Sequence, residues 1–152
     1  MKKTKEYIID NKDTSVVEDV LVRYNAQKDF TSLDAWKKAR LVKLFFYNEV
    51  IPLLPVEEKH NLNSQIRRAS VSGTANISEG YGRYHYQEGI QFYRISRGSI
   101  YELKGHLISC FDFKYVNKEI FEKGIILIED AKITLNGYIK FVETQKSNTK
   151  KV

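Results

Sequence analysis

The feature that most constrains the fold is the stretch from residue 65 to residue 83, QIRRASVSGTANISEGYGR. It begins with a basic, helix-forming segment, continues with small side chains and ends in Gly-Tyr-Gly-Arg. A second stretch, residues 97–103, repeats this mixture of charge, glycine and small side chains within another helical pattern. Because the distance between packed helices depends on the side chains between them, the two stretches are predicted to face each other closely. The pattern indicates a tightly packed helix pair and no obvious active site.

Apolar residues recur at steps of three and four in four segments, which is the spacing of one helix face. The first predicted helix begins at an N-cap, Ser32, and is stopped by Pro52 and Pro55. Its predicted apolar positions are Leu33, Trp36, Leu44, Tyr47 and Ile51. The second predicted helix runs from residue 62 to about residue 78. Its predicted inner face, rich in small residues, consists of Leu62, Ile66, Ala69, Gly73 and Ile77.

A loop at residues 80–83 precedes the third predicted helix, and its glycines are expected to adopt positive φ angles. The third helix is predicted over residues 86 to about 114, with two apolar edges. One edge contains Tyr86, Ile90, Tyr93, Ile100, Leu107 and Phe111, and the other contains Phe92, Ser96, Ser99, Leu103, Cys110 and Phe113.

The fourth helix is predicted to follow a cap at Asn117. Its apolar positions, at close to heptad spacing, are Phe121, Ile128, Ala131, Leu135, Tyr138 and Val142. Ile126 and Ile133 lie on a separate line.

These elements predict an all-α fold, an antiparallel up-and-down four-helix bundle. The predicted bundle domain covers residues 30–143. Residues 1–29 are an N-terminal extension whose apolar patch is compatible with a strand or a short helix, and residues 144–152 are expected to be a basic, disordered tail. The third and fourth predicted helices each carry a second line of apolar residues, which is more apolar surface than the interior of one bundle can bury. This favours self-association over the alternative that each helix has one wide apolar stripe facing the core.

The formal net charge of +6 falls on the predicted body and tail, because residues 1–29 contain equal numbers of basic and acidic side chains. Such an excess is compatible with nucleic-acid binding and equally with an ordinary solvated surface.

The sequence offers little catalytic chemistry. The single cysteine, Cys110, lies among apolar residues, which favours a buried thiol over a reactive one. The three histidines are widely separated, so neither a metal site nor a cofactor is expected. Glu79 and His85 are the only acid–base candidates, and no enzyme activity is expected. No apolar run is long enough to cross a membrane, so a cytoplasmic protein is expected.

Several motifs in order carry a resemblance to a family. The first is a helix start at Leu33, Trp36, Lys37 and Ala39; the second is Leu62, Gln65, Arg67, Arg68 and Ala69. The third is Asn76, Ile77, Glu79, Gly80, Gly82 and Arg83, and the last is Phe92, Ile95, Arg97, Gly98, Ser99, Glu102 and Leu103. From residue 30 to residue 141 the chain resembles the four-helix bundle family called ribosomal S23 or 23S rRNA intervening-sequence proteins.

The resemblance implies a bacterial homopentamer, assembled as a ring, with a basic surface and no established enzyme activity. A similar bundle is the accessory protein of diversity-generating retroelements, where it partners a reverse transcriptase and nucleic acid. Two functions are therefore expected as alternatives. One is binding of nucleic acid, RNA or DNA, through a basic surface; the other is a scaffold that docks a partner enzyme such as a reverse transcriptase.

The charged motif residues divide into two groups of candidates. Those expected to face a phosphate backbone are Lys37, Lys38, Arg40, Lys43, Arg67, Arg83 and Arg94, although a merely solvated surface is an equal alternative for the lysine-rich helix. Those expected to form structural ion pairs between helices are Arg68, Glu79, Arg97 and Glu102. The tyrosines that are candidates for stacking on unpaired bases are Tyr81, Tyr84, Tyr86, Tyr93 and Tyr101. Tyrosines at helical spacing, however, more often pack in a core or an interface.

Overall fold

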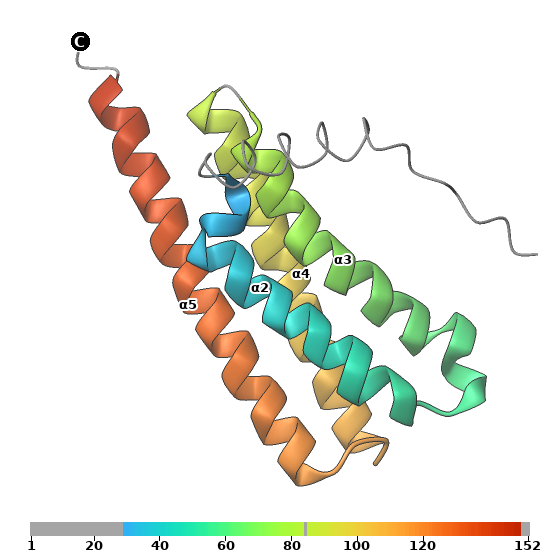
Figure 1. Cartoon of the computed structure of the whole chain (residues 1–152). Coiled ribbons are helices and arrows are strands. Elements are labelled where there is room, and N and C mark those ends of the chain that lie inside the picture. Colours follow the sequence, from blue (N-terminus) through green and yellow to red (C-terminus); the bar gives the residue numbers. More distant parts are fainter. Residues whose placement is uncertain (1–28, 84, 150–152) are drawn as a thin grey trace, which may run out of the picture.

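The chain folds into the all-α bundle that its apolar spacing predicts. The computed structural model describes residues 29–83 and 85–149, and these residues form four α-helices and no strand. The helices are α2 (Asp34–Phe45), α3 (Leu62–Tyr81), α4 (Tyr86–Asp112) and α5 (Lys118–Thr149). Each helix packs against the next in the chain and α5 returns to pack against α2, so that neighbours run in opposite directions (Figure 1).

The first helix begins one residue later than predicted, after a short 3₁₀ turn, η1 (Phe30–Ser32). The carboxylate of Asp29 caps this turn by accepting a hydrogen bond from the Thr31 backbone N–H at 2.8 Å. Ser32 is not the N-cap of α2, because its hydroxyl donates to the backbone carbonyl of Asp29 at 2.7 Å, and Leu33 occupies the cap position. The regular α-helix ends at Phe45, earlier than the predicted stop at Pro52. The chain continues through a π-helical turn, η2 (Phe46–Val50), and a 3₁₀ turn, η3 (Ile51–Leu53), which contains Pro52.

The predicted apolar face of the first helix is wrong in its details. Its buried side chains are Ala35, Ala39, Val42, Phe45, Phe46, Val50 and Ile51. Leu33, Trp36, Leu44 and Tyr47 are only partly buried at the edge of the core. Ala35 and Ala39 face inward because their small side chains let the neighbouring helices approach α2. The larger Trp36 and Tyr47 therefore lie at the edge of the core.

The predicted close approach of the two small-residue stretches is confirmed at the contact between α3 and α4. The Ser96 hydroxyl on α4 donates to the Gly73 backbone carbonyl on α3 at 2.6 Å, and the hydroxyls of Ser72 and Ser99 lie 2.8 Å apart. The predicted inner face of α3 is also confirmed, since all five of its residues are buried.

The prediction of positive φ angles at residues 80–83 is wrong, since no glycine in the described part of the chain has one. Gly80 instead lies inside α3, which continues through Tyr81, and the Cβ of any other residue there would lie 2.6 Å from the Tyr93 ring. The glycine is needed for helix contact and not for a turn.

The third helix has one buried stripe where two apolar edges were predicted. The stripe combines residues of both edges: Gly89, Ile90, Tyr93, Ser96, Ser99, Ile100, Leu103, Leu107 and Cys110. Tyr86, Phe111 and Phe113 are exposed near the helix ends. Serines in the stripe are tolerated because they form hydrogen bonds to α3, which a purely apolar pattern does not reveal.

The fourth helix follows its predicted cap and pattern. The side chain of Asn117 accepts a hydrogen bond from the Ile120 backbone N–H at 2.9 Å. Ile126 and Ile133, predicted to lie on a separate line, are 68% and 70% exposed. Residues 144–149, expected to belong to a disordered tail, are instead helical because α5 continues to Thr149. The rest of that tail and the extension before Asp29 lie outside the described residues. Among the helices described, none is both long and apolar enough to cross a membrane.

Candidate nucleic-acid interface

Four of the seven cations predicted to face phosphates are paired with carboxylates. The pairs are Lys37 with Asp34 (3.4 Å), Lys38 with Asp130 (2.6 Å), Arg94 with Glu143 (3.0 Å) and Arg83 with Glu79. Arg83 also stacks on Phe92, its guanidinium carbon 4.5 Å from the ring centroid. A neighbouring carboxylate cancels much of the potential that would attract a phosphate, so these four positions are weak candidates.

The other three cations, Arg40, Lys43 and Arg67, have no carboxylate partner among the described residues. The ammonium of Lys43 lies 3.5 Å from the Thr74 hydroxyl, and the Arg67 guanidinium donates to the Asn63 side-chain oxygen at 2.8 Å. Both partners are neutral, so the positive charges of the two side chains remain uncompensated.

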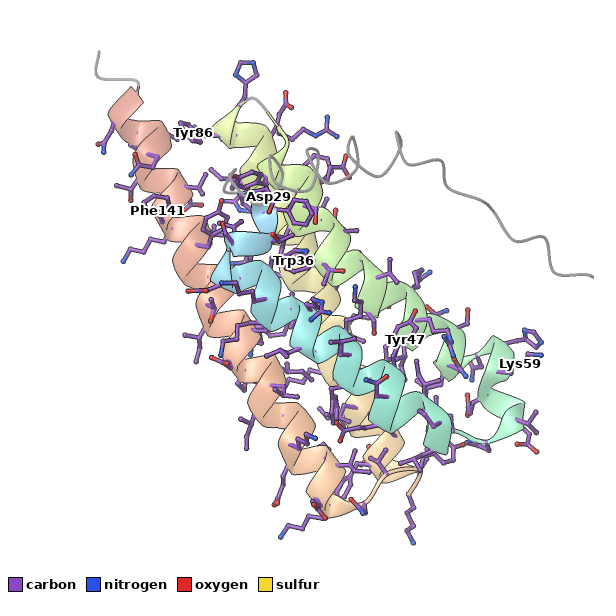
Figure 2. The ribbon with its side chains drawn as sticks, in the orientation of Figure 1. Asp29, Trp36, Tyr47, Lys59, Tyr86 and Phe141 are labelled. Atoms are coloured by element: carbon purple, nitrogen blue, oxygen red, sulfur yellow. The ribbon has the colours of Figure 1, made fainter. Side chains whose placement is uncertain are left out.

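A groove lies where the end of α2 and η2 meet α3; Lys43 lines it, and Arg67 contacts its Tyr47 wall. The groove has a volume of about 360 Å³ and is lined by Lys43, Leu44, Tyr47, Asn48 and Val71. The guanidinium carbon of Arg67 lies 5.0 Å from the centroid of the Tyr47 ring, within the range of a cation–π contact. Figure 2 shows Tyr47 between the C-terminal part of α2 and the N-terminal part of α3.

The sequence makes this face of the bundle cationic. Helices α2 and α3 together carry six basic and two acidic side chains, whereas α4 and α5 carry eight of each. No carboxylate occurs on α2 after Asp34, and none on α3 before Glu79. Among the four α-helices, the excess positive charge therefore belongs to α2 and α3; three carboxylates, Glu49, Glu57 and Glu58, lie in the turns between these two helices.

The four predicted ion-pair residues lie on the surface rather than in an apolar environment. Arg68 is 3.4 Å from Glu102 across the α3–α4 contact, and Glu79 bonds to Arg83 within one chain segment. Arg97 forms no ion pair with any residue that the structure describes; its guanidinium donates to the Asn136 side chain on α5 at 3.0 Å. Exposed pairs of this kind add little stability.

A polar network between α4 and α5 was not predicted. Glu129 accepts hydrogen bonds from Lys104 on α4 at 2.6 Å and from Lys132 at 2.9 Å, and Lys132 is only 9% exposed. The Lys132 ammonium also lies 4.3 Å from the Tyr101 ring centroid. Hydrogen bonds from Lys104, and next from Lys132, lower the pKa of Glu129, and its carboxylate raises the pKa of Lys132. The i, i+3 spacing of Glu129 and Lys132 was the available sequence signal.

The tyrosines considered for base stacking have different environments. Tyr93 is buried against Tyr138 with ring centroids 5.0 Å apart, and burial raises the pKa of its hydroxyl. Tyr101 contacts Lys132, while Tyr81 and Tyr86 are exposed. Tyr84 lies outside the described residues.

The thiol of Cys110 is fully buried, which confirms the interpretation of a buried small residue. Burial raises its pKa to about 11, so the nucleophilic thiolate is scarce at neutral pH. The acid–base candidate Glu79 is engaged by Arg83. Within the described chain, no group of three His, Cys, Asp or Glu side chains is placed to hold a metal ion.

These observations define the class of protein: an all-α, four-helix bundle with a cationic groove between two of its helices. The chain matches the family model described as 23S rRNA-intervening sequence protein over residues 31–137, which is more than half of its length. It belongs to that family. A comparison with curated proteins found no match.

Proposed function

We propose that the chain is a non-enzymatic protein that binds nucleic acid through the α2–α3 face. The observation that carries the proposal is the pair of cations at the groove, Lys43 and Arg67, whose partners are neutral. Arg40, exposed on α2, extends the same charge. Cations of this kind bind phosphate oxygens and release counterions, which favours association without requiring a particular sequence. The family description names an rRNA, which supports RNA as the ligand over DNA.

The number of free cations sets the expected salt dependence. If Arg40, Lys43 and Arg67 each neutralise one phosphate, the logarithm of the affinity falls with a slope of about −2 against the logarithm of salt concentration for a single strand. A fourfold increase in salt then weakens binding by about 15-fold for each protomer engaged.

The test is fluorescence anisotropy of a labelled RNA across a salt series. The double variant Lys43→Glu with Arg67→Glu is expected to lose at least about tenfold in affinity and most of the salt slope. The matched control, Lys118→Glu with Lys140→Glu, makes the same change in net charge on α5 and is expected to retain most of the affinity. Equal binding by the groove variant and the natural chain, or binding that does not depend on salt, refutes the proposal.

We also propose that the chain self-associates through a second surface; the number of subunits, five by the family resemblance, is part of this proposal. Tyr101, Ile108, Ile126 and Ile133 on α4 and α5 are between 41% and 70% exposed, and exposed apolar surface of this kind is typical of interfaces. Assembly as a ring would present several copies of the groove to one strand and raise the apparent affinity.

The particle mass from light scattering tests this interface. Ile133→Asp is expected to shift the particle toward a monomer, whereas Val56→Asp, at another exposed apolar position, leaves the mass unchanged. If the natural chain is monomeric, the apolar surface instead favours the second candidate function, a scaffold that docks a partner protein such as a reverse transcriptase.

A further inference from the structure

We infer that the α2–α3 groove holds an unpaired nucleobase, so that the ligand is a single strand or a loop and not a continuous duplex. The inference rests on the proposed function, because it specifies what the cationic face recognises. A surface that binds only phosphates needs cations, but it does not need the apolar hollow that lies between them here.

The walls of the groove have the chemistry of a base-binding site. Leu44 on α2 and Val71 on α3 supply apolar surface, and Val71 is 49% exposed. Tyr47 adds an aromatic ring that is only partly buried, and Asn48 adds an amide with both a donor and an acceptor. The apolar surface suits the flat face of a base, and the amide suits the hydrogen-bonding groups on its edge.

The contact between Arg67 and Tyr47 provides a planar platform. The guanidinium lies over the ring at 5.0 Å, and its Nε–H bond to Asn63 restricts its rotation. Bases stack on both aromatic rings and guanidinium planes, and each stacked base contributes about 1–3 kcal/mol to binding.

The cations flank the apolar part of the groove. Lys43 on α2 precedes Tyr47 in η2 by about one helical turn, and its ammonium contacts the Thr74 hydroxyl on the facing helix. Arg67 lies about two turns from Thr74, beside Tyr47. A strand lying along the groove therefore meets a cation on each side of its base. The groove volume of about 360 Å³ is near the lower end of the range of about 300–1,000 Å³ for small-molecule sites, which suits one base.

The experiment compares three labelled ligands of equal length at one salt concentration: single-stranded RNA, duplex RNA and a ribose-phosphate strand without bases. Single-stranded RNA is expected to bind about 5- to 150-fold more tightly than the strand without bases, which is the stacking contribution of one base. Duplex RNA is expected to bind with the weaker affinity, because its bases are not available for stacking.

Two variants test the platform while preserving charge. Arg67→Lys keeps the positive charge but removes the guanidinium plane, and Tyr47→Leu keeps apolar bulk but removes the ring. Each is expected to reduce the preference for bases without changing the affinity for the strand that lacks them. Arg97→Lys on α4 is the matched control, since the Arg97 guanidinium donates to Asn136 on α5 and contacts no residue that lines the groove. If Tyr47→Leu does not fold, the exposed Arg67→Lys substitution decides the question.

The outcomes separate this inference from the proposed function. Equal binding of strands with and without bases, both abolished by charge reversal at Lys43 and Arg67, overturns the base site and leaves phosphate binding intact. Binding that is insensitive to this charge reversal overturns both. A preference for bases that Arg67→Lys does not reduce places the stacking elsewhere and also refutes the inference.

Discussion

Replacement of Gly80 by alanine is expected to destabilise the bundle although alanine is the better helix former. A Cβ at residue 80 would lie 2.6 Å from the Tyr93 ring and 2.9 Å from the backbone carbonyl oxygen of Gly89. Favourable contacts between non-bonded carbon atoms are about 3.5–4.0 Å, so α3 and α4 would have to separate by up to about 1 Å here. The separation cannot be avoided by a side-chain rotation alone, because the second contact is with backbone.

The magnitude follows from two opposing terms. The substitution gains about 1 kcal/mol in helix propensity, and overpacking of a close contact typically costs about 1–3 kcal/mol or more. Tyr93 is itself held in the core against Tyr138, so its ring has little freedom to yield. The overpacking cost is therefore expected at the upper end of its range, about 2–3 kcal/mol, which leaves a net loss of about 1–2 kcal/mol in the free energy of unfolding, or roughly 2–8 °C in melting temperature for a chain of this length.

Gly105 is the matched control on α4. It is exposed and a Cβ there would have nothing within 4 Å, so Gly105→Ala is expected to stabilise the chain by about 0.5–1 kcal/mol. Urea unfolding followed by far-ultraviolet circular dichroism measures both variants on one scale. If Gly80→Ala is as stable as Gly105→Ala, the two helices do not approach as closely as the structure indicates, and the reasoning fails.

Two further predictions concern titratable groups. Glu129→Gln is expected to lower the midpoint of urea unfolding, because it removes the carboxylate that faces Lys104 and Lys132. Since the pKa of Glu129 is lowered in the folded chain, the carboxylate stabilises the fold above about pH 4.5, and this stabilisation is lost as the pH falls. Urea unfolding of the variant should therefore lack this loss of stability in acid. Cys110, whose pKa burial raises from 9.0 to about 11, is expected to resist thiol reagents until the chain unfolds. Because the unfolded thiol ionises first, stability should fall between about pH 9 and 11, and Cys110→Ala should remove that part of the pH profile.

The sequence predicted the number of helices, their starts within one residue and the contact between α3 and α4. These features depend on local spacing, prolines and small residues, all of which are visible in one chain. The buried face of α2 was wrong because Ala35 and Ala39 are weak apolar signals, whereas Trp36 and Tyr47 are strong ones. Which side of an aromatic-rich helix faces inward depends on the space that the other helices leave, and that is a property of the assembled bundle.

The candidate site was predicted only in part, for a related reason. Lys38 and Arg94 resembled Lys43 and Arg67 in sequence, since all four are cations on amphipathic helices. Their carboxylate partners, Asp130 and Glu143, are distant in the chain and meet them only through α5. The groove beside Tyr47 likewise forms only when α2 and α3 pack together.

The distribution of ion pairs around the bundle explains why the charge of one face is available for a ligand. Pairs cross the contacts of α5 with α2 and α4 at Lys38–Asp130, Arg94–Glu143 and Lys104–Glu129, and the α3–α4 contact at Arg68–Glu102. At the α2–α3 contact of the described bundle, Lys43 meets a hydroxyl and Arg67 meets an aromatic ring. If Lys43 and Arg67 served only to stabilise the α2–α3 contact, we would expect each to pair with a carboxylate, because uncompensated like charges repel one another. The lack of carboxylate partners for Lys43 and Arg67 in the described bundle therefore supports the proposed anionic ligand, and the groove lined by Lys43 and Tyr47 offers that ligand a place to dock.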